Sequence, residues 1–179
     1  MDNGNTWEKS KEICAESLNY IRGERTVKKE ESGIPVSEQS FYGRGVIQPT
    51  LWEDEKGVHM LLRSTEGHIY RSDSGDMGKT WTDAYPIKLP NNNSGIDLVK
   101  MENKELVLIY NPVEENWGMR SPISLAVSKD GGKTFERIKD LDSKEGEFSY
   151  PAVIAHNDRV FVSYTYKREN IAFWEIKIR

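Results

Sequence analysis

One short pattern occurs three times in this chain and limits what the chain can fold into. Residues 74–81 read Ser-Gly-Asp-Met-Gly-Lys-Thr-Trp, residues 128–135 repeat the pattern with Phe at its end, and residues 2–7 show it without the opening Ser. The Asp of such a turn accepts backbone hydrogen bonds, the Gly supplies an angle that other residues resist, and the aromatic ring anchors the turn to a sheet. The pattern therefore predicts hairpin turns, and Asp76 and Asp130 are interpreted as turn residues rather than catalytic carboxylates.

Short apolar segments of strand length flank the second and third copies of the pattern. The first unit is expected to contain strands at residues 47–52, 58–63, 68–72 and 85–89. The second unit is expected to contain strands at residues 96–99, 106–110, 121–127 and 135–138, and the last unit at residues 150–154, 160–164 and 171–178. A further outer strand is expected at residues 8–13. Units of four short strands, repeated at intervals of tens of residues, are typical of β-propeller blades.

The repeated pattern resembles the Asp-box of the BNR repeats in sialidases (neuraminidases) and related β-propellers. This resemblance implies an all-β fold, a β-propeller of the six-bladed sialidase type, with about three blades present in this chain. Residues 1–45 are expected to form the remnant of a truncated blade and a loop, and residues 46–179 a single sialidase-like domain of two full blades and a partial last blade. Because the first Asp-box lacks its Ser, we expect the chain to be a C-terminal fragment of a longer protein.

Composition excludes several other classes of protein. The net charge of −4 leaves no basic footprint for nucleic acid, and no apolar run approaches the ~18 residues of a membrane-spanning helix. Cys14 is the only cysteine and the three histidines are scattered, so we expect neither a metal site nor a cofactor. The compartment is left unassigned, since the native N-terminus that could carry a signal peptide is expected to be missing.

The resemblance implies an anion-binding site built from arginines. Arg63 ends a predicted strand ahead of one Asp-box, and Arg120 precedes the next, which matches the second and third arginines of the sialidase clamp. Guanidinium groups suit a sugar carboxylate because they are planar, always charged and bidentate. Arg71 is a weaker candidate for substrate binding.

The resemblance also implies a tyrosine nucleophile. Tyr150 opens the last unit, where sialidases place this residue, and a phenol needs a neighbouring carboxylate because its ordinary pKa is about 10. Gln48 stands where the sialidase Glu is expected, and an amide cannot take the proton. Glu53 is expected to face the opposite side of that strand, because side chains alternate.

Polar residues before the second unit complete the candidate site. Asn93 and Ser94 are candidates for binding sugar hydroxyls, and Asp97 is a candidate acid or base. Glu147 and Tyr110 lie near strand ends and are similar candidates.

The function expected from the resemblance is a sialidase-like glycoside hydrolase, exo-acting on a terminal acidic sugar of a glycan. Three alternatives stay open: a non-catalytic carbohydrate-binding propeller, which Gln48 favours; a lyase or rhamnosidase-like enzyme on the same scaffold; and a degenerate gene product without a function of its own. Half a propeller leaves sheet faces uncovered, so we expect either self-association or a missing N-terminal half to cover them.

Overall fold

The computed structural model describes residues 6–15 and 44–178, and these residues contain strands, turns and loops but no helix. The strands are β1 (Val46–Asp54), β2 (Gly57–Ser64), β3 (His68–Ser74), β4 (Tyr85–Pro90), β5 (Asp97–Lys100), β6 (Leu106–Tyr110), β7 (Ile123–Ser128), β8 (Glu136–Asp142), β9 (Phe148–His156), β10 (Arg159–Tyr166) and β11 (Asn170–Lys177). The prediction of an all-β fold is therefore confirmed, and each strand predicted after residue 45 overlaps an observed strand.

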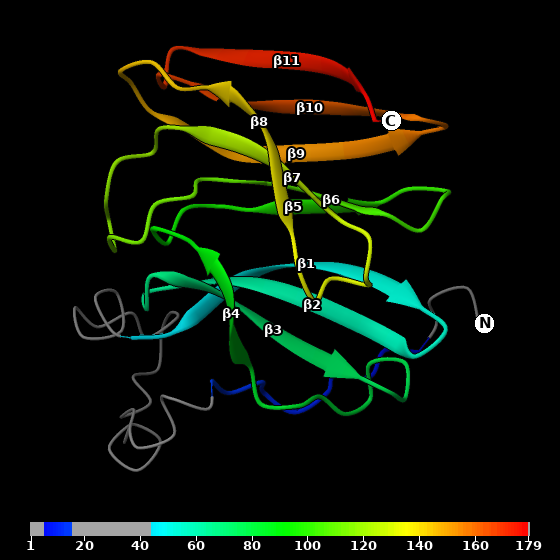
Figure 1. Cartoon of the computed structure of the whole chain (residues 1–179). Coiled ribbons are helices and arrows are strands. Elements are labelled where there is room, and N and C mark those ends of the chain that lie inside the picture. The colour runs from blue at the N-terminus through cyan, green and yellow to red at the C-terminus, as the bar shows by residue number, and fades with distance from the viewer. Residues whose placement is uncertain (1–5, 16–43, 179) are drawn as a thin grey trace.

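The strands form three antiparallel sheets that stack on one another (Figure 1). The first sheet has the order β1-β2-β3-β4, the second β5-β6-β7-β8, and the third β11-β10-β9. Consecutive strands pair in each sheet, and the first strands of the sheets, β1, β5 and β9, pack beside one another. Three such units side by side are about three blades of a β-propeller, as the sequence predicted.

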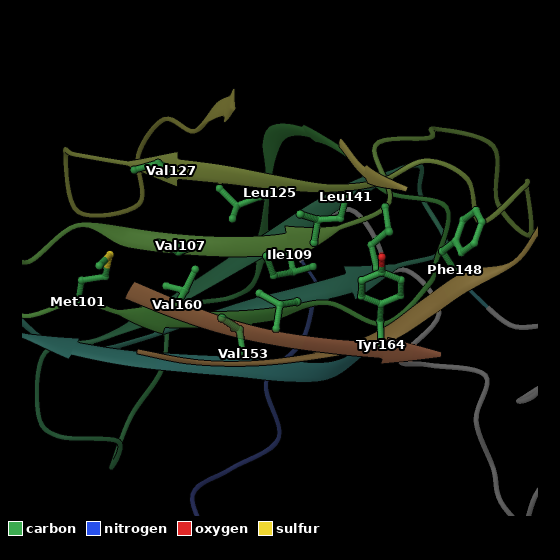
Figure 2. Packing of buried hydrophobic residues seen from close by; sticks show 12 residues of the cluster. Met101, Val107, Ile109, Leu125, Val127, Leu141, Phe148, Val153, Val160 and Tyr164 are labelled. Atoms are coloured by element: carbon green, nitrogen blue, oxygen red, sulfur yellow. The ribbon is translucent and has the colours of Figure 1, made fainter. Parts of the chain in front are cut away.

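The second sheet is buried on both faces because it lies between the other two. All residues of β6 and β7 are buried, which explains why these segments read as almost continuous apolar runs. Val107, Ile109 and Leu125 point from this sheet towards Val160 and Tyr164 of the third sheet (Figure 2). Leu106 and Leu108 face the other way and pack with Leu61 and Ile69 of the first sheet. Each fully buried side chain of this kind contributes about 1.5–3 kcal/mol to folding.

A short N-terminal segment covers the outer face of the first sheet. Ala15 forms a parallel bridge with Ala84, and it packs with Met60, Leu62 and Tyr70. The outer strand predicted at residues 8–13 was wrong, since this segment pairs with the sheet only through the Ala15 bridge and the Cys14 carbonyl. Of the first copy of the repeated pattern only Thr6 and Trp7 are described, so its predicted turn lies outside the described residues.

The outer face of the third sheet is open in the described part of the chain. Ile154 of β9 and both Ile171 and Phe173 of β11 are 66–70% exposed. Their neighbours on the opposite side of the same strands, such as Val153 and Trp174, pack into the core between the second and third sheets. The expectation that another blade or a second copy covers this face stays a prediction.

The turns at residues 74–81 and 128–135 have the same hydrogen-bond network. In the first, Ser74 Oγ donates to Asp76 Oδ1 over 2.8 Å, and Asp76 accepts from both the backbone N–H and the hydroxyl of Thr80. In the second, Asp130 accepts the corresponding bonds from Ser128 and Thr134. Both Asp residues are therefore turn-forming, as their sequence pattern indicated.

These two carboxylates make the fold sensitive to acid. Hydrogen bonds from Thr80 lower the pKa of Asp76 to about 2; burial alone would raise the pKa of Asp130, but bonds from Thr134 and Ser128 lower it to about 2. Because both values lie below the ordinary 3.8, the contribution to stability is complete above about pH 4 and is lost as the pH falls towards 2.

We expect the urea concentration at the unfolding midpoint to decrease as the pH is lowered from about 5 to about 2. We expect a smaller decrease in Asp130→Asn, which has lost one of these carboxylates. Fluorescence-monitored urea unfolding at several pH values measures this, with Glu102→Gln, at an exposed carboxylate outside both turns, as the matched control. An unchanged pH dependence in Asp130→Asn would contradict the assignment.

Candidate functional site

The predicted site residues gather at one end of the inner strands. Gln48 lies near the start of β1, Tyr150 near the start of β9, and Asn93 just before β5. All three have a positive φ, of 51°, 54° and 61° respectively, which is uncommon for residues other than Gly. Strained backbone is found at functional sites as well as in turns, and here it coincides with the residues that the sequence selected, so this end of the stack is the candidate site.

Gln48 and Tyr150 meet over Gly95. A Cβ atom added to Gly95 would lie 3.4 Å from Cδ1 of Tyr150 and 3.5 Å from Oε1 of Gln48. Gln48 is the extra residue of a β-bulge, because Ile47 pairs with Arg63 and Pro49 with Leu62. The alternation used to place Glu53 therefore does not run across Gln48; Glu53 instead lies near the opposite end of β1.

Arg120 and Tyr150 are in direct contact. The guanidinium carbon of Arg120 lies 5.1 Å from the centroid of the Tyr150 ring, within the range of a cation–π interaction. Arg120 is also the main cause that lowers the pKa of Tyr150; burial opposes this shift, and the charges of Arg63 and Arg168 add to it. The phenol is 48% exposed, so a ligand can reach it.

Glu147 orients this arginine. It accepts a 2.9 Å hydrogen bond from Arg120 Nη1, a 3.1 Å bond from Ser149 Oγ and a 2.7 Å bond from Arg168 Nε. Burial alone would raise its pKa, but the bonds from Arg168 and Ser149 and the nearby charges hold the pKa below its ordinary value. Glu147 is therefore an ionised partner of two arginines rather than a proton donor near neutral pH.

Arg63 is the second cation of the site. Its Nη1 donates to the backbone oxygen of Asn93 over 2.9 Å. Burial lowers the pKa of its guanidinium; Tyr150 opposes this shift and the positive charge of Arg120 adds to it. Among the described residues, Nε of Arg63 and Oδ1 of Asn93 are buried without a hydrogen-bond partner. The structure thus brings Arg63, Arg120, Tyr150 and Asn93 together with Gln48.

Asp97 and Ser94 have their hydrogen bonds within the protein. Asp97 Oδ1 accepts from the Thr50 hydroxyl over 2.9 Å, and Oδ2 accepts from the backbone N–H of Val153 over 2.9 Å. This carboxylate therefore connects β1, β5 and β9. Ser94 Oγ donates to Asn111 Oδ1 inside the core and is fully buried.

Arg71 lies elsewhere, between the first two sheets. It packs over the Trp52 ring at 5.1 Å, bonds to Asp73 Oδ1 at 2.8 Å, and donates to the backbone oxygen of Gly131 at 3.1 Å. The structure does not bring Arg71 to the other two arginines, because β3 carries it towards the turn at residues 128–135.

The residues that sequence reasoning missed are Arg168 and Ser149. Arg168 lies in the turn between β10 and β11, so only the folding of the third sheet brings it to Glu147. Ser149 immediately precedes Tyr150, and no motif pointed to it. In residues 6–15 and 44–178 no three His, Cys, Asp or Glu side chains gather as metal ligands, and no helix could cross a membrane.

Comparison with known proteins identifies relatives of this chain. A family model described as a BNR repeat-like domain matches residues 1–162. No curated protein sequence matches significantly. A protein of unknown function from Dyadobacter fermentans has a TM-score of 0.67 at 20% identity, with 99% of this chain aligned to 44% of that one.

Two solved glycosidases have a similar fold. A Trypanosoma rangeli sialidase has a TM-score of 0.61 at 15% identity, covering 98% of this chain and 26% of that one. An α-L-arabinofuranosidase from Fusarium graminearum has a TM-score of 0.57 at 16% identity, covering 74% and 45%. This chain therefore spans less than half the length of each of these structures, and at such identity the likeness concerns the fold.

Proposed function

The chain belongs to the family of BNR repeat-like domains, and from that premise we propose that it forms part of a sialidase-like glycoside hydrolase acting on a terminal acidic sugar. The observation that carries the proposal is the convergence of Arg63 and Arg120 beside Tyr150 at one end of the inner strands. Two guanidinium groups can hold a carboxylate by paired, charge-assisted hydrogen bonds. The glycosidases with a similar fold support a carbohydrate as ligand. The proposal also takes the turns at residues 74–81 and 128–135 as Asp-boxes.

The proposed roles follow from the contacts. Arg63 and Arg120 bind the sugar carboxylate, and Glu147 holds Arg120 in position. Tyr150 lies under the anomeric carbon, where a lowered pKa makes its phenol a better nucleophile. The side-chain amide oxygen of Asn93 is buried and lacks a hydrogen-bond donor in the described residues. Arg71, Ser94 and Asp97 are assigned to packing, because their polar groups are held by other parts of the protein.

A non-catalytic carbohydrate-binding propeller is the second candidate, and Gln48 favours it. Its amide oxygen lies beside Gly95 and Tyr150, where a catalytic base is expected, and an amide takes no proton. Glu147 is engaged by hydrogen bonds from Arg120 and Arg168. On this reading neither Gln48 nor Glu147 supplies a base for Tyr150.

Calorimetric titration with N-acetylneuraminic acid and with galactose tests the proposal. We expect the acidic sugar to bind in preference to the neutral one, and Arg120→Gln to weaken its binding about tenfold or more, since a charge-assisted pair is lost. Arg137→Gln, which removes an exposed arginine on β8, is the matched control and leaves binding unchanged.

Release of 4-methylumbelliferone from its sialoside separates the two candidates. Turnover that Tyr150→Phe abolishes supports the hydrolase, whereas binding of the acidic sugar without turnover supports the binding propeller. Equal affinity for both sugars, or the same affinity in Arg120→Gln as in the unmodified chain, would falsify the assignment of the arginines.

A further inference from the structure

Glu147 gives its two carboxylate oxygens to two different arginines. Its Oε1 accepts from Arg120 Nη1 over 2.9 Å and from Ser149 Oγ over 3.1 Å, whereas its Oε2 accepts from Arg168 Nε over 2.7 Å. The side chain of Arg120 is 15% exposed and that of Arg168 is 67% exposed. Arg168 therefore holds the solvent side of the carboxylate that orients Arg120.

The turn that carries Arg168 has a backbone conformation that its residues do not favour. This turn joins β10 to β11, and the backbone N–H of Glu169 donates to the backbone oxygen of Tyr166 over 3.1 Å. Lys167 and Arg168, the two residues between them, have φ values of 54° and 58°. Turns with two positive φ angles favour Asn and Gly, because this conformation is costly for residues with long side chains. Local turn preference therefore does not explain why Arg168 stands here.

The same turn is fastened to the residues around Glu147. The backbone N–H of Lys167 donates to the backbone oxygen of Glu147 over 2.7 Å, and Tyr166 pairs with Phe148 in the sheet. A Cβ atom added to Gly146 would lie 3.0 Å from Cε of Lys167, so the lysine side chain lies against the backbone before Glu147. Backbone pairing thus brings Arg168 to Glu147. An exposed ion pair contributes little to stability, so the consequence of this pair is for the site rather than for the fold.

Arg168 also contributes to the charge around Tyr150. Arg120 is the main cause that lowers the pKa of this phenol, burial opposes the shift, and the charges of Arg63 and Arg168 add to it. The site therefore has three guanidinium groups and the one carboxylate of Glu147. Without Arg168 two guanidinium groups would remain beside that carboxylate, and half of the net positive charge would be lost. A smaller positive charge attracts an acidic sugar less strongly.

We propose that Arg168 is a positioning residue of the candidate site: it holds Glu147, and Glu147 in turn holds Arg120 against Tyr150. The ligand in this inference rests on the proposed function, in which Arg120 binds the carboxylate of an acidic sugar. The arrangement of Arg168, Glu147 and Arg120 exists without a ligand, so it can be tested without one.

Titration of the Tyr150 ring in the ligand-free chain, followed by NMR, is the first test. The Tyr150 signals are identified by their absence in Tyr150→Phe. We expect Arg168→Gln to raise the pKa of Tyr150, because a positive charge is lost and Arg120 is held less firmly. Arg168→Lys is expected to restore the pKa of the unmodified chain, since an ammonium group keeps the charge and can donate to Glu147.

Arg159→Gln is the matched control for this titration. Arg159 begins β10, at the end of the third sheet away from Arg168, and it also pairs with a glutamate, Glu175. We expect this control to leave the pKa of Tyr150 unchanged. Both Arg→Gln variants are expected to unfold at the same urea concentration, since each loses one exposed ion pair.

A second substitution shows whether Arg168 acts through Glu147. In Glu147→Gln the carboxylate that links the two arginines is gone, so adding Arg168→Gln is expected to raise the pKa of Tyr150 less than it does in the unmodified chain. Equal shifts in the two backgrounds would mean that Arg168 acts on Tyr150 by its charge alone, which overturns the positioning role.

Calorimetric titration with N-acetylneuraminic acid extends the test to binding. We expect Arg168→Gln to weaken the affinity about threefold or more, and Arg168→Lys to bind as the unmodified chain does. If the unmodified chain does not bind this sugar, the proposed function fails, and the Tyr150 titration still decides the role of Arg168. That role is overturned if Tyr150 titrates alike in Arg168→Gln and Arg159→Gln, or if these two variants bind the sugar equally well.

Discussion

Replacing Gly57 by alanine is expected to destabilise the chain by about 3 kcal/mol or more. A Cβ atom at this position would lie 2.0 Å from the backbone oxygen of Ser74 and 3.1 Å from Cα of Gly75, and backbone atoms cannot move aside as a flexible side chain can. Gly57 also has a φ of +137°, a conformation that residues with a side chain rarely adopt. The residue lies where the β1–β2 hairpin touches the start of the turn at residues 74–81.

Urea unfolding followed by tryptophan fluorescence measures this loss. Gly45→Ala is the matched control, since a Cβ atom there meets nothing within 4 Å and its φ is not positive. We expect the control to stay within about 0.5 kcal/mol of the unmodified chain. Similar midpoints for Gly57→Ala and Gly45→Ala would show that the hairpin and the turn are not in contact.

Removing the Asp97 carboxylate is expected to cost about 2–4 kcal/mol. In Asp97→Ala the backbone N–H of Val153 loses its side-chain acceptor, and the Thr50 hydroxyl keeps only its longer 3.4 Å bond to the Leu98 backbone oxygen. Asp97→Asn keeps one oxygen but presents an amide N–H to the other donor, so an intermediate loss is expected. The urea midpoints of the two variants give this order directly.

Two further measurements separate this structural role from a catalytic one. Asp158→Asn removes an exposed carboxylate paired with Lys177, and as a control it changes stability by about 0.5 kcal/mol or less. If Asp97→Ala is as stable as that control, the carboxylate does not join the sheets. A loss of turnover in a fully stable Asp97→Asn protein would instead return Asp97 to the role of acid or base.

The fold could be predicted from the sequence because its signals are local. Apolar runs such as residues 106–110 mark strands buried on both faces, and the Ser, Asp and Thr of each turn pattern make their bonds within eight residues of sequence. The prediction of an outer strand at residues 8–13 failed because it also rested on local signals, which do not show whether the backbone pairs with a sheet. Apolar residues such as Ile13 do pack on the first sheet, but the backbone reaches a partner only at Ala15.

The candidate site was predictable only in part, because its contacts are long-range. The position of Arg120 indicated a site residue, but its bond to Glu147 depends on the pairing of different sheets. The sequence offered Arg71 as a weaker candidate for substrate binding, but its strand position could not indicate the Trp52 ring on which it lies, apart from the other two arginines. The bulge at Gln48 also interrupts the alternation of side chains between the two faces of β1, and the sequence pattern alone could not reveal this bulge.

The side-by-side arrangement of β1, β5 and β9 has a consequence for how the molecule comes apart. Contacts between sheets run from the first to the second and from the second to the third, as in a linear array of repeats. Such an array frays from its ends: β11 has a neighbour on one side only and an open face, whereas the middle sheet opens only after one of its neighbours has left. The amide hydrogens of β6 and β7 therefore belong to the slowest-exchanging unit of the described chain.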